Sequence, residues 1–134
     1  MLYQGDNESL KKYSIVMVVF GVSLFGLPIF LELLPDLFRW HEPAVNMADE
    51  RMIVSMYYAL GICFLMGAKD PVRNSIIIDY TIISSVLHGL VMAYYAMFVL
   101  ETEMAHMWGD VPFLFAVAIF FFFYHPRKIA RASA

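Results

Sequence analysis

Four long apolar segments, separated by short polar stretches, dominate the pattern of hydrophobic and polar positions along the chain. They run over residues 13–34, 52–68, 76–100 and 105–125. Because a helix needs about 20 mostly apolar residues to cross the hydrocarbon core of a bilayer, the pattern predicts an all-α, integral membrane fold. We expect a four-transmembrane-helix bundle that forms one domain over residues 1–134. The fourth segment is the least clear, since its continuous apolar run covers only 111–124.

The first segment and the link that follows it contain residues that interrupt helices. Gly21, Gly26 and Pro28 predict a bend in the second half of the segment. The link over residues 35–51 is the longest in the chain and contains Pro35 and Pro43. It is long enough to hold a short helix at the membrane surface.

Basic residues separate the two ends of the predicted bundle. Seven of the nine lie on the side of the termini and of the link between segments two and three: Lys11, Lys12, Lys69, Arg73, Arg127, Lys128 and Arg131. Arg39 and Arg51 lie on the opposite side, with eight of the twelve acidic residues. Cytoplasmic loops carry an excess of Lys and Arg, so the pattern predicts that both termini are cytoplasmic.

Composition strengthens the membrane interpretation and excludes several function classes. The chain is 61% hydrophobic and 16% charged, whereas soluble domains are roughly 45–50% apolar and about 25% charged. Its basic residues are too few and too scattered for nucleic acid. There is no phosphate-binding Gly loop, nucleophile elbow, paired-Cys motif or HExxH, which argues against an enzyme and leaves the cofactor unknown. The lone cysteine, Cys63, excludes an internal disulfide.

Small residues recur at every fourth position on segments two and three. The stripe on segment two is Ser55, Ala59, Cys63 and Gly67, and the stripe on segment three is Ser85, Gly89 and Ala93. In lipid, helices associate through close packing of small residues and a few hydrogen bonds. A link of about seven residues makes the two segments an antiparallel hairpin. We therefore expect the two stripes to pack face to face.

Polar groups inside segment three raise a question of function. Ser84, His88 and Tyr95 fall on one face of the helix, and His88 lies near the middle of the bilayer, where a polar group needs a partner or a cavity. One interpretation is a neutral imidazole hydrogen-bonded to a neighbouring helix. The other is a site in which these three residues bind a hydrophobic cofactor, such as a quinone, pigment or haem, or line a proton path. Asp79 is expected at the membrane boundary near Arg73.

The loops on the acidic side offer a candidate metal site. Imidazole and thioether groups occur there at His41, Met104, His106 and Met107. Thioether sulfur with imidazole suits copper(I). The spacing matches no known metal motif, and the alternative is a solvated acidic rim that enforces the topology.

Residues 52–92 carry a family pattern, Y-x-L-G-x-x-x-L/F-x-x-A-x-x-P, then S-x-I, then S-S-x-x-H-x-x-V-M. The matching positions are Tyr58, Leu60, Gly61, Ala68, Pro71, Ser75, Ile77, Ser84, Ser85, His88, Val91 and Met92. The segment resembles an uncharacterised family of small bacterial four-helix integral membrane proteins, a domain of unknown function. The resemblance implies a membrane fold and importance for Ser84, Ser85 and His88, and it implies no reaction.

Three kinds of function are compatible with these features. The leading hypothesis is a non-catalytic accessory or structural subunit of a larger bacterial membrane complex, with lipid and other membrane subunits, or further copies of the chain, as partners. The second is an oligomeric transporter of protons or small solutes that uses His88. The third is a binder of a hydrophobic cofactor between helices, and a membrane enzyme is the remaining alternative.

Overall fold

The computed structural model describes residues 2–40 and 47–132, and every regular element within these ranges is helical. The elements are α1 (Glu8–Ser23), the 3₁₀-helix η1 (Leu24–Gly26), α2 (Leu27–Leu33), α3 (Pro35–Phe38), α4 (Met47–Gly67), α5 (Ile76–Phe98), the 3₁₀-helix η2 (Glu101–Trp108), α6 (Asp110–Phe123) and α7 (Pro126–Ala132). The all-α prediction is confirmed for the part of the chain that the structure describes.

Three helical stretches are long and apolar enough to cross a membrane. They are Glu8–Leu33, Ile76–Phe98 and Thr102–Ala132. Large apolar side chains on their surfaces are exposed, among them Val19, Leu87 and Phe123. Contiguous apolar surface of this kind is rare on soluble monomers and is what a lipid-facing helix presents. The structure is therefore consistent with a membrane location. Helix α4 is not one of the three stretches.

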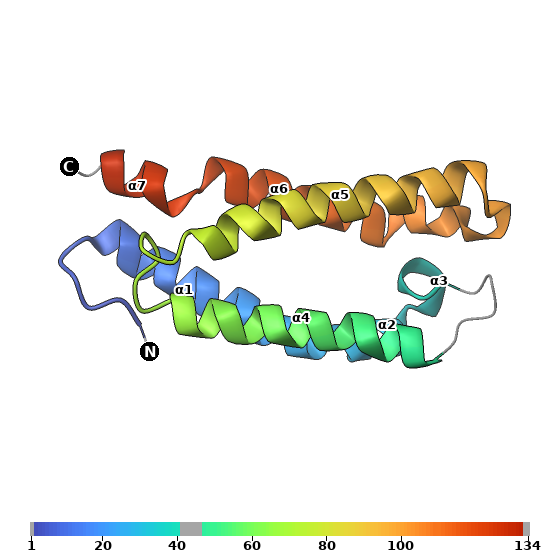
Figure 1. The fold of residues 1–134 in the computed structure, drawn as a ribbon, viewed down its shortest axis with the longest axis horizontal. Helices are drawn as coiled ribbons and strands as arrows, with labels where there is room; N and C mark the ends of the chain where they lie inside the picture. The colour runs from blue at the N-terminus through green and yellow to red at the C-terminus, as the bar shows by residue number, and fades with distance from the viewer. Residues whose placement is uncertain (1, 41–46, 133–134) are drawn as a thin grey trace.

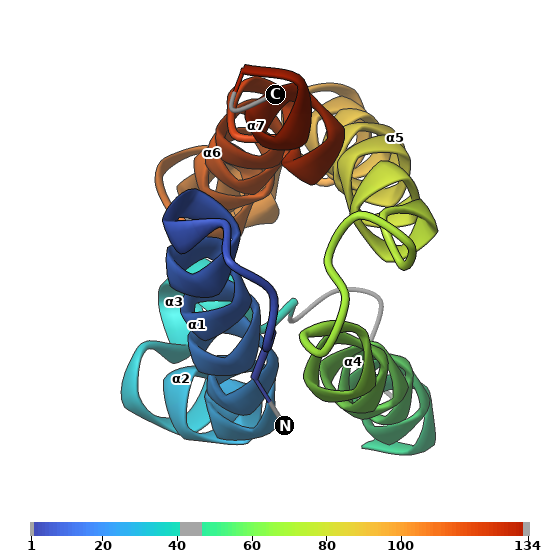
Figure 2. The same cartoon turned by 90° about the vertical axis from the view of Figure 1, so that its left-hand side faces the viewer.

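Two pairs of long helices form the molecule (Figures 1 and 2). Helix α1 lies against α4, and α5 lies against α6. The N-terminus, the C-terminus and the 68–75 link lie at one end of the molecule, which we call the terminus end. Helix α3 and η2 pack against each other at the opposite end, which we call the η2 end.

The expected face-to-face packing of the two small-residue stripes is wrong. On α5, Ser85, Gly89 and Ala93 are buried, and Gly89 faces Leu114 and Phe115 of α6. On α4, Ser55, Ala59 and Cys63 are exposed, and only Gly67 of that stripe is buried.

A different pair of glycines brings α4 into contact with α1. A Cβ atom at Gly61 would lie 2.8 Å from the Gly21 carbonyl oxygen, and one at Gly21 would lie 2.9 Å from the Gly61 carbonyl oxygen. Both distances are too short for a real Cβ, so the two backbones touch where the helices cross. This contact uses a face of α4 that lies beside the predicted stripe.

The apolar core lies toward the terminus end. Its buried members come from α1, α4, α5 and α6 and from the residue after α4: Tyr13, Met17, Phe64, Ala68, Ile78 and Phe121. Buried Ser14 adds polar contacts there, because its Oγ donates to the Ala68 carbonyl at 2.6 Å and accepts the Tyr3 N–H at 3.0 Å. The core therefore joins both helix pairs at this end.

The helix boundaries differ from expectation by several residues in three of the four segments. Helix α1 begins at Glu8 rather than at 13, and α4 begins at Met47 rather than at 52. The 3₁₀-helix η1 interrupts the first segment between α1 and α2, in the region where the bend was predicted. The fourth helix, α6, begins at Asp110 rather than at 105, because residues 101–108 form η2 and Gly109 turns the chain with φ −116° and ψ −105°. Pro112 lies in the first turn of α6, where its missing N–H has no intrahelical partner to lose.

Candidate functional site: a buried histidine cluster at the η2 end

The imidazole of His106 is fully buried between two carboxylates. Its Nδ1 lies 3.0 Å and 3.1 Å from the two carboxylate oxygens of Asp110, and its Nε2 lies 3.2 Å from Oε2 of Glu103. Glu103 is 2% exposed and the Asp110 side chain is 13% exposed. We call Glu103, His106 and Asp110 the His106 cluster. An ionised carboxylate only accepts hydrogen bonds, so both ring nitrogens carry hydrogen when both carboxylates are ionised.

Local backbone structure explains why these three side chains meet. Glu103 and His106 are three residues apart in η2, so their side chains project to the same side of a helix with three residues per turn. Asp110 opens α6 directly after the turn at Gly109. A Cβ at Gly109 would collide with the Leu37 carbonyl, so the turn depends on a residue without a side chain.

The indole of Trp40, which follows α3, covers the imidazole of His106. The rings of Trp40 and His106 stack with centroids 4.4 Å apart and planes 22° apart. An indole face attracts a cation, so the stacking favours the charged form of the imidazole. The Trp40 Nε1 atom is buried, and no hydrogen-bond partner is present for it among the described residues.

The guanidinium of Arg39 holds the segment that carries Trp40 in place. Arg39 makes two hydrogen bonds to Glu50 of α4, at 2.9 Å and 3.1 Å, and one to Glu32 of α2 at 2.9 Å. The two-point contact with Glu50 has the fork geometry that makes Arg–carboxylate pairs specific. Arg39 therefore joins α2 and α4 next to Trp40.

His88 of α5 contacts a tyrosine of α4. It is partly buried, and its Nδ1 lies 3.5 Å from the Tyr57 hydroxyl of α4, at the limit of a hydrogen bond. This contact joins the middle of α5 to α4.

The structure does not bring the three predicted residues of α5 together. Ser84 Oγ donates to the Thr81 carbonyl of the preceding turn at 3.3 Å, as such serines commonly do. Tyr95 is 45% exposed and packs edge-to-face on Tyr94. Tyr57, which sequence reasoning did not select, is the residue that contacts His88.

The arrangement at the η2 end does not favour the copper hypothesis. Both ring nitrogens of His106 face carboxylates, so neither offers a lone pair to a metal beside Met104 or Met107. Within residues 2–40 and 47–132 there is no group of three or more His, Cys, Asp and Glu side chains that could hold a metal ion. His41 lies outside the described residues. The hypothesis stays a prediction.

Asp79, in the first turn of α5, belongs to a second polar cluster at the terminus end. Its Oδ1 lies 3.0 Å from Nε2 of His125, and its Oδ2 lies 3.3 Å from Nη1 of Arg127. His125 Nδ1 accepts the Arg127 N–H at 3.2 Å. Sequence reasoning missed His125, whose only signal was its position directly before Pro126.

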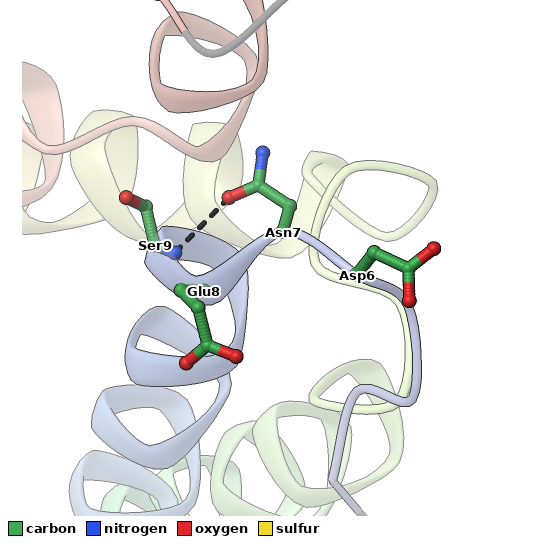
Figure 3. A pocket seen from close by; sticks show the side chains of 4 residues that line it. All are labelled: Asp6, Asn7, Glu8 and Ser9. Carbon is green, nitrogen blue, oxygen red and sulfur yellow. Dashed lines mark hydrogen bonds between the residues drawn. The ribbon is translucent and has the colours of Figure 1, made fainter.

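Two hollows mark the surface without adding to these clusters. One, of about 410 Å³, is open and is lined by Asp6, Asn7, Glu8 and Ser9, around the first turn of α1 (Figure 3). There Asn7 caps the helix by accepting the N–H groups of Ser9 and Leu10. The other, of about 330 Å³, is an apolar groove between α1 and α6 with Phe20 and Phe113 in its walls.

Comparison with known proteins places the chain in a family. Residues 8–129 match the family model described as "Family of unknown function (DUF6632)". Neither the curated proteins nor the solved structures give a match. The predicted resemblance to a family of unknown function is confirmed. Since the match covers most of the chain, this protein belongs to DUF6632, a family of unknown function.

Proposed function

We propose that this protein is a non-catalytic subunit of a larger complex in a bacterial cytoplasmic membrane. In the proposed arrangement α4 is a fourth span beside the three apolar stretches, and both termini face the cytoplasm. The partners are other membrane subunits, whereas further copies of the chain as the sole partners belong to the transport hypothesis.

The distribution of basic residues supports this topology. Lys11, Lys69 and Arg127 belong to the terminus end, together with four further basic residues. Arg39 and Arg51 belong to the η2 end, and Arg39 is engaged by two carboxylates. The positive-inside rule therefore favours a cytoplasmic terminus end.

The observation that carries the proposal is the exposed small-residue face of α4, formed by Ser55, Ala59 and Cys63. Small residues expose backbone and gain little from contact with lipid chains, whereas they allow another helix to approach closely. The equivalent stripe on α5 is buried against α6 within the same chain. The stripe on α4 has no such cover among the described residues, so we assign it to a helix of another chain.

Co-purification from native membranes tests the proposal. Membranes are solubilised in a mild detergent, the tagged protein is captured at low salt, and bound chains are identified by mass spectrometry together with an absorption spectrum. We expect one or more membrane proteins in stoichiometric amounts. A colourless homo-oligomer without other subunits would instead favour the transport hypothesis, and a bound chromophore on the isolated chain would favour the cofactor hypothesis.

A further inference from the structure

We propose that α7 and the end of α6 form a binding surface for the headgroup of an anionic phospholipid. This surface, which we call the α7 surface, consists of Phe122, Phe123, Tyr124, Lys128 and Arg131. The inference rests on the membrane location that the proposed function gives to the chain. It does not depend on which other subunits the chain binds.

The terminus end carries an excess of positive charge. Its seven basic residues stand against four acidic ones, Asp6, Glu8, Asp70 and Asp79, so its side chains carry a formal charge of +3. The rest of the chain has two basic and eight acidic residues and carries −6. Basic side chains next to a membrane span attract anionic headgroups, so the terminus end is the one that suits such lipids.

Several of these cations are exposed and have no acidic partner within residues 2–40 and 47–132. They are Lys12, Lys69, Arg73 and Arg131. Lys128 is exposed as well, and its printed hydrogen bond goes to a backbone carbonyl rather than to a carboxylate. The phosphate of a lipid therefore meets cations at this end whose charge the protein itself leaves uncompensated.

Helix α7 turns its basic side away from the protein. His125 and Pro126 are buried, and Ile129 packs against the apolar core, whereas Lys128 and Arg131 are exposed. The helix lies next to α1 at the terminus end (Figure 2). Because the protein covers the apolar side of α7, its cations are free to contact headgroups.

Aromatic rings set the depth of the α7 surface in the membrane. Phe122, Phe123 and Tyr124 end the third apolar stretch, and each of their side chains is more than half exposed. Rings at the end of a span typically lie at the level of the headgroups. The Nζ atom of Lys128 lies 4.1 Å from the centroid of the Phe122 ring, so this cation shares their depth.

The donors of the α7 surface match a phosphate. The ammonium of Lys128 has three N–H donors and gives one to the Phe122 carbonyl at 2.6 Å, which leaves two for phosphate oxygens. The guanidinium of Arg131 offers a planar fork that can bind two phosphate oxygens at once. The exposed rings beside Lys128 contact the upper part of the acyl chains.

Native mass spectrometry of the purified full chain tests the inference. The chain is equilibrated with mixed micelles that hold equal amounts of phosphatidylglycerol and phosphatidylcholine with the same acyl chains, and the lipids that stay bound are counted. We expect phosphatidylglycerol to be retained in about tenfold excess or more. The double variant Lys128→Gln, Arg131→Gln should lower this excess by about fivefold or more, since each cation near an anionic lipid contributes roughly that factor.

Matched controls separate a lipid site from a general effect of charge or folding. Arg51→Gln removes an exposed cation from the η2 end and should leave the excess unchanged. The charge-conserving double variant Lys128→Arg, Arg131→Lys should retain it. An excess of inorganic phosphate should not displace the bound lipid, because the free anion lacks acyl chains.

Three results would overturn the inference. They are equal retention of the two lipids, an unchanged excess in the Gln double variant, and displacement of phosphatidylglycerol by inorganic phosphate, which would indicate a site for a free anion. None of them bears on whether other subunits co-purify with the chain, so the proposed function is tested separately.

Discussion

The carboxylate of Asp79 lies 3.0 Å from the Nε2 atom of His125, which is 46 residues further along the chain. Asp79 belongs to the first turn of α5, and His125 directly precedes α7. Because Nδ1 of His125 accepts the Arg127 N–H, its Nε2 is the atom that donates to Asp79 in the neutral ring. One imidazole therefore both caps α7 and joins it to α5.

The first prediction concerns this connection. Asp79→Asn should loosen α7, because the amide removes the negative charge that holds Arg127 and weakens the bond from His125. The groups are partly exposed, so we expect a loss of at most about 1 kcal/mol in the free energy of α7 docking. Limited trypsin cleavage at Arg127 and Lys128 should become faster. Asp6→Asn, an exposed carboxylate at the same end, should leave the cleavage rate unchanged.

The second prediction concerns the crossing of α1 and α4. Gly61→Ala should lower the free energy of unfolding by roughly 1–3 kcal/mol, because the new methyl group meets the Gly21 backbone, which cannot move aside easily. Unfolding of the purified protein by SDS, followed by circular dichroism, measures the effect. Gly26→Ala is the matched control, since a Cβ at Gly26 has no neighbour within 4 Å. Equal stability of the two variants would contradict the backbone contact.

The third prediction concerns the buried hydroxyl at the terminus end. Ser14→Ala removes the donor to the Ala68 carbonyl and leaves both this carbonyl and the Tyr3 N–H without their partner. The expected loss in unfolding free energy is about 1–3 kcal/mol. Ser23→Ala should be close to neutral in the same SDS titration, because its hydroxyl is exposed and bonds only within its own helix turn. A neutral Ser14→Ala would mean that water replaces the lost bonds.

The fourth prediction concerns the polarity of His88. A glutamine or asparagine at this position can still hydrogen-bond to the Tyr57 hydroxyl, whereas leucine leaves that hydroxyl without its nearest partner. We therefore expect His88→Gln and His88→Asn to accumulate at higher levels in membranes than His88→Leu, as measured by immunoblotting. Equal levels of all three variants would show that the polar contact contributes nothing to folding.

Sequence patterning predicted the helices better than their partners. Apolar runs identify a span because each run is long relative to the membrane, and α5 ends within two residues of the predicted limit. Which helix faces which depends on single close contacts, such as Gly21 with Gly61, and small residues occur on more than one face. The stripe on α5 does pack closely, but against α6, and the stripe on α4 is exposed.

The polar clusters were predicted only in part, for the same reason. His106, His88 and Asp79 stood out because they are ionisable residues in or beside apolar segments. Their partners could not be read from the sequence, since Tyr57 and His125 lie 31 and 46 residues away from the groups they meet. The acidic partners of His106, Glu103 and Asp110, are close to it in sequence. Their contact with its ring was not predicted, because it depends on the 3₁₀ geometry of η2 and the turn that follows.

The fifth prediction concerns topology. In a Cys63→Ser background, single cysteines are introduced at Trp108, which is 84% exposed at the η2 end, and at Ser9 and Arg131 at the terminus end. A membrane-impermeant maleimide applied to spheroplasts should label Trp108→Cys and should label the other two only after permeabilisation. Labelling of all three without permeabilisation would contradict the proposed four spans.

Photocrosslinking from the exposed face of α4 tests the central claim most directly. A photoreactive amino acid is placed at Ala59 in the small-residue stripe, and at Leu87, an exposed apolar position on α5, as the control. After illumination of native membranes, the account predicts a discrete crosslinked protein band from Ala59 and none from Leu87. Crosslinks to lipid alone at both positions would contradict the claim that another chain covers α4.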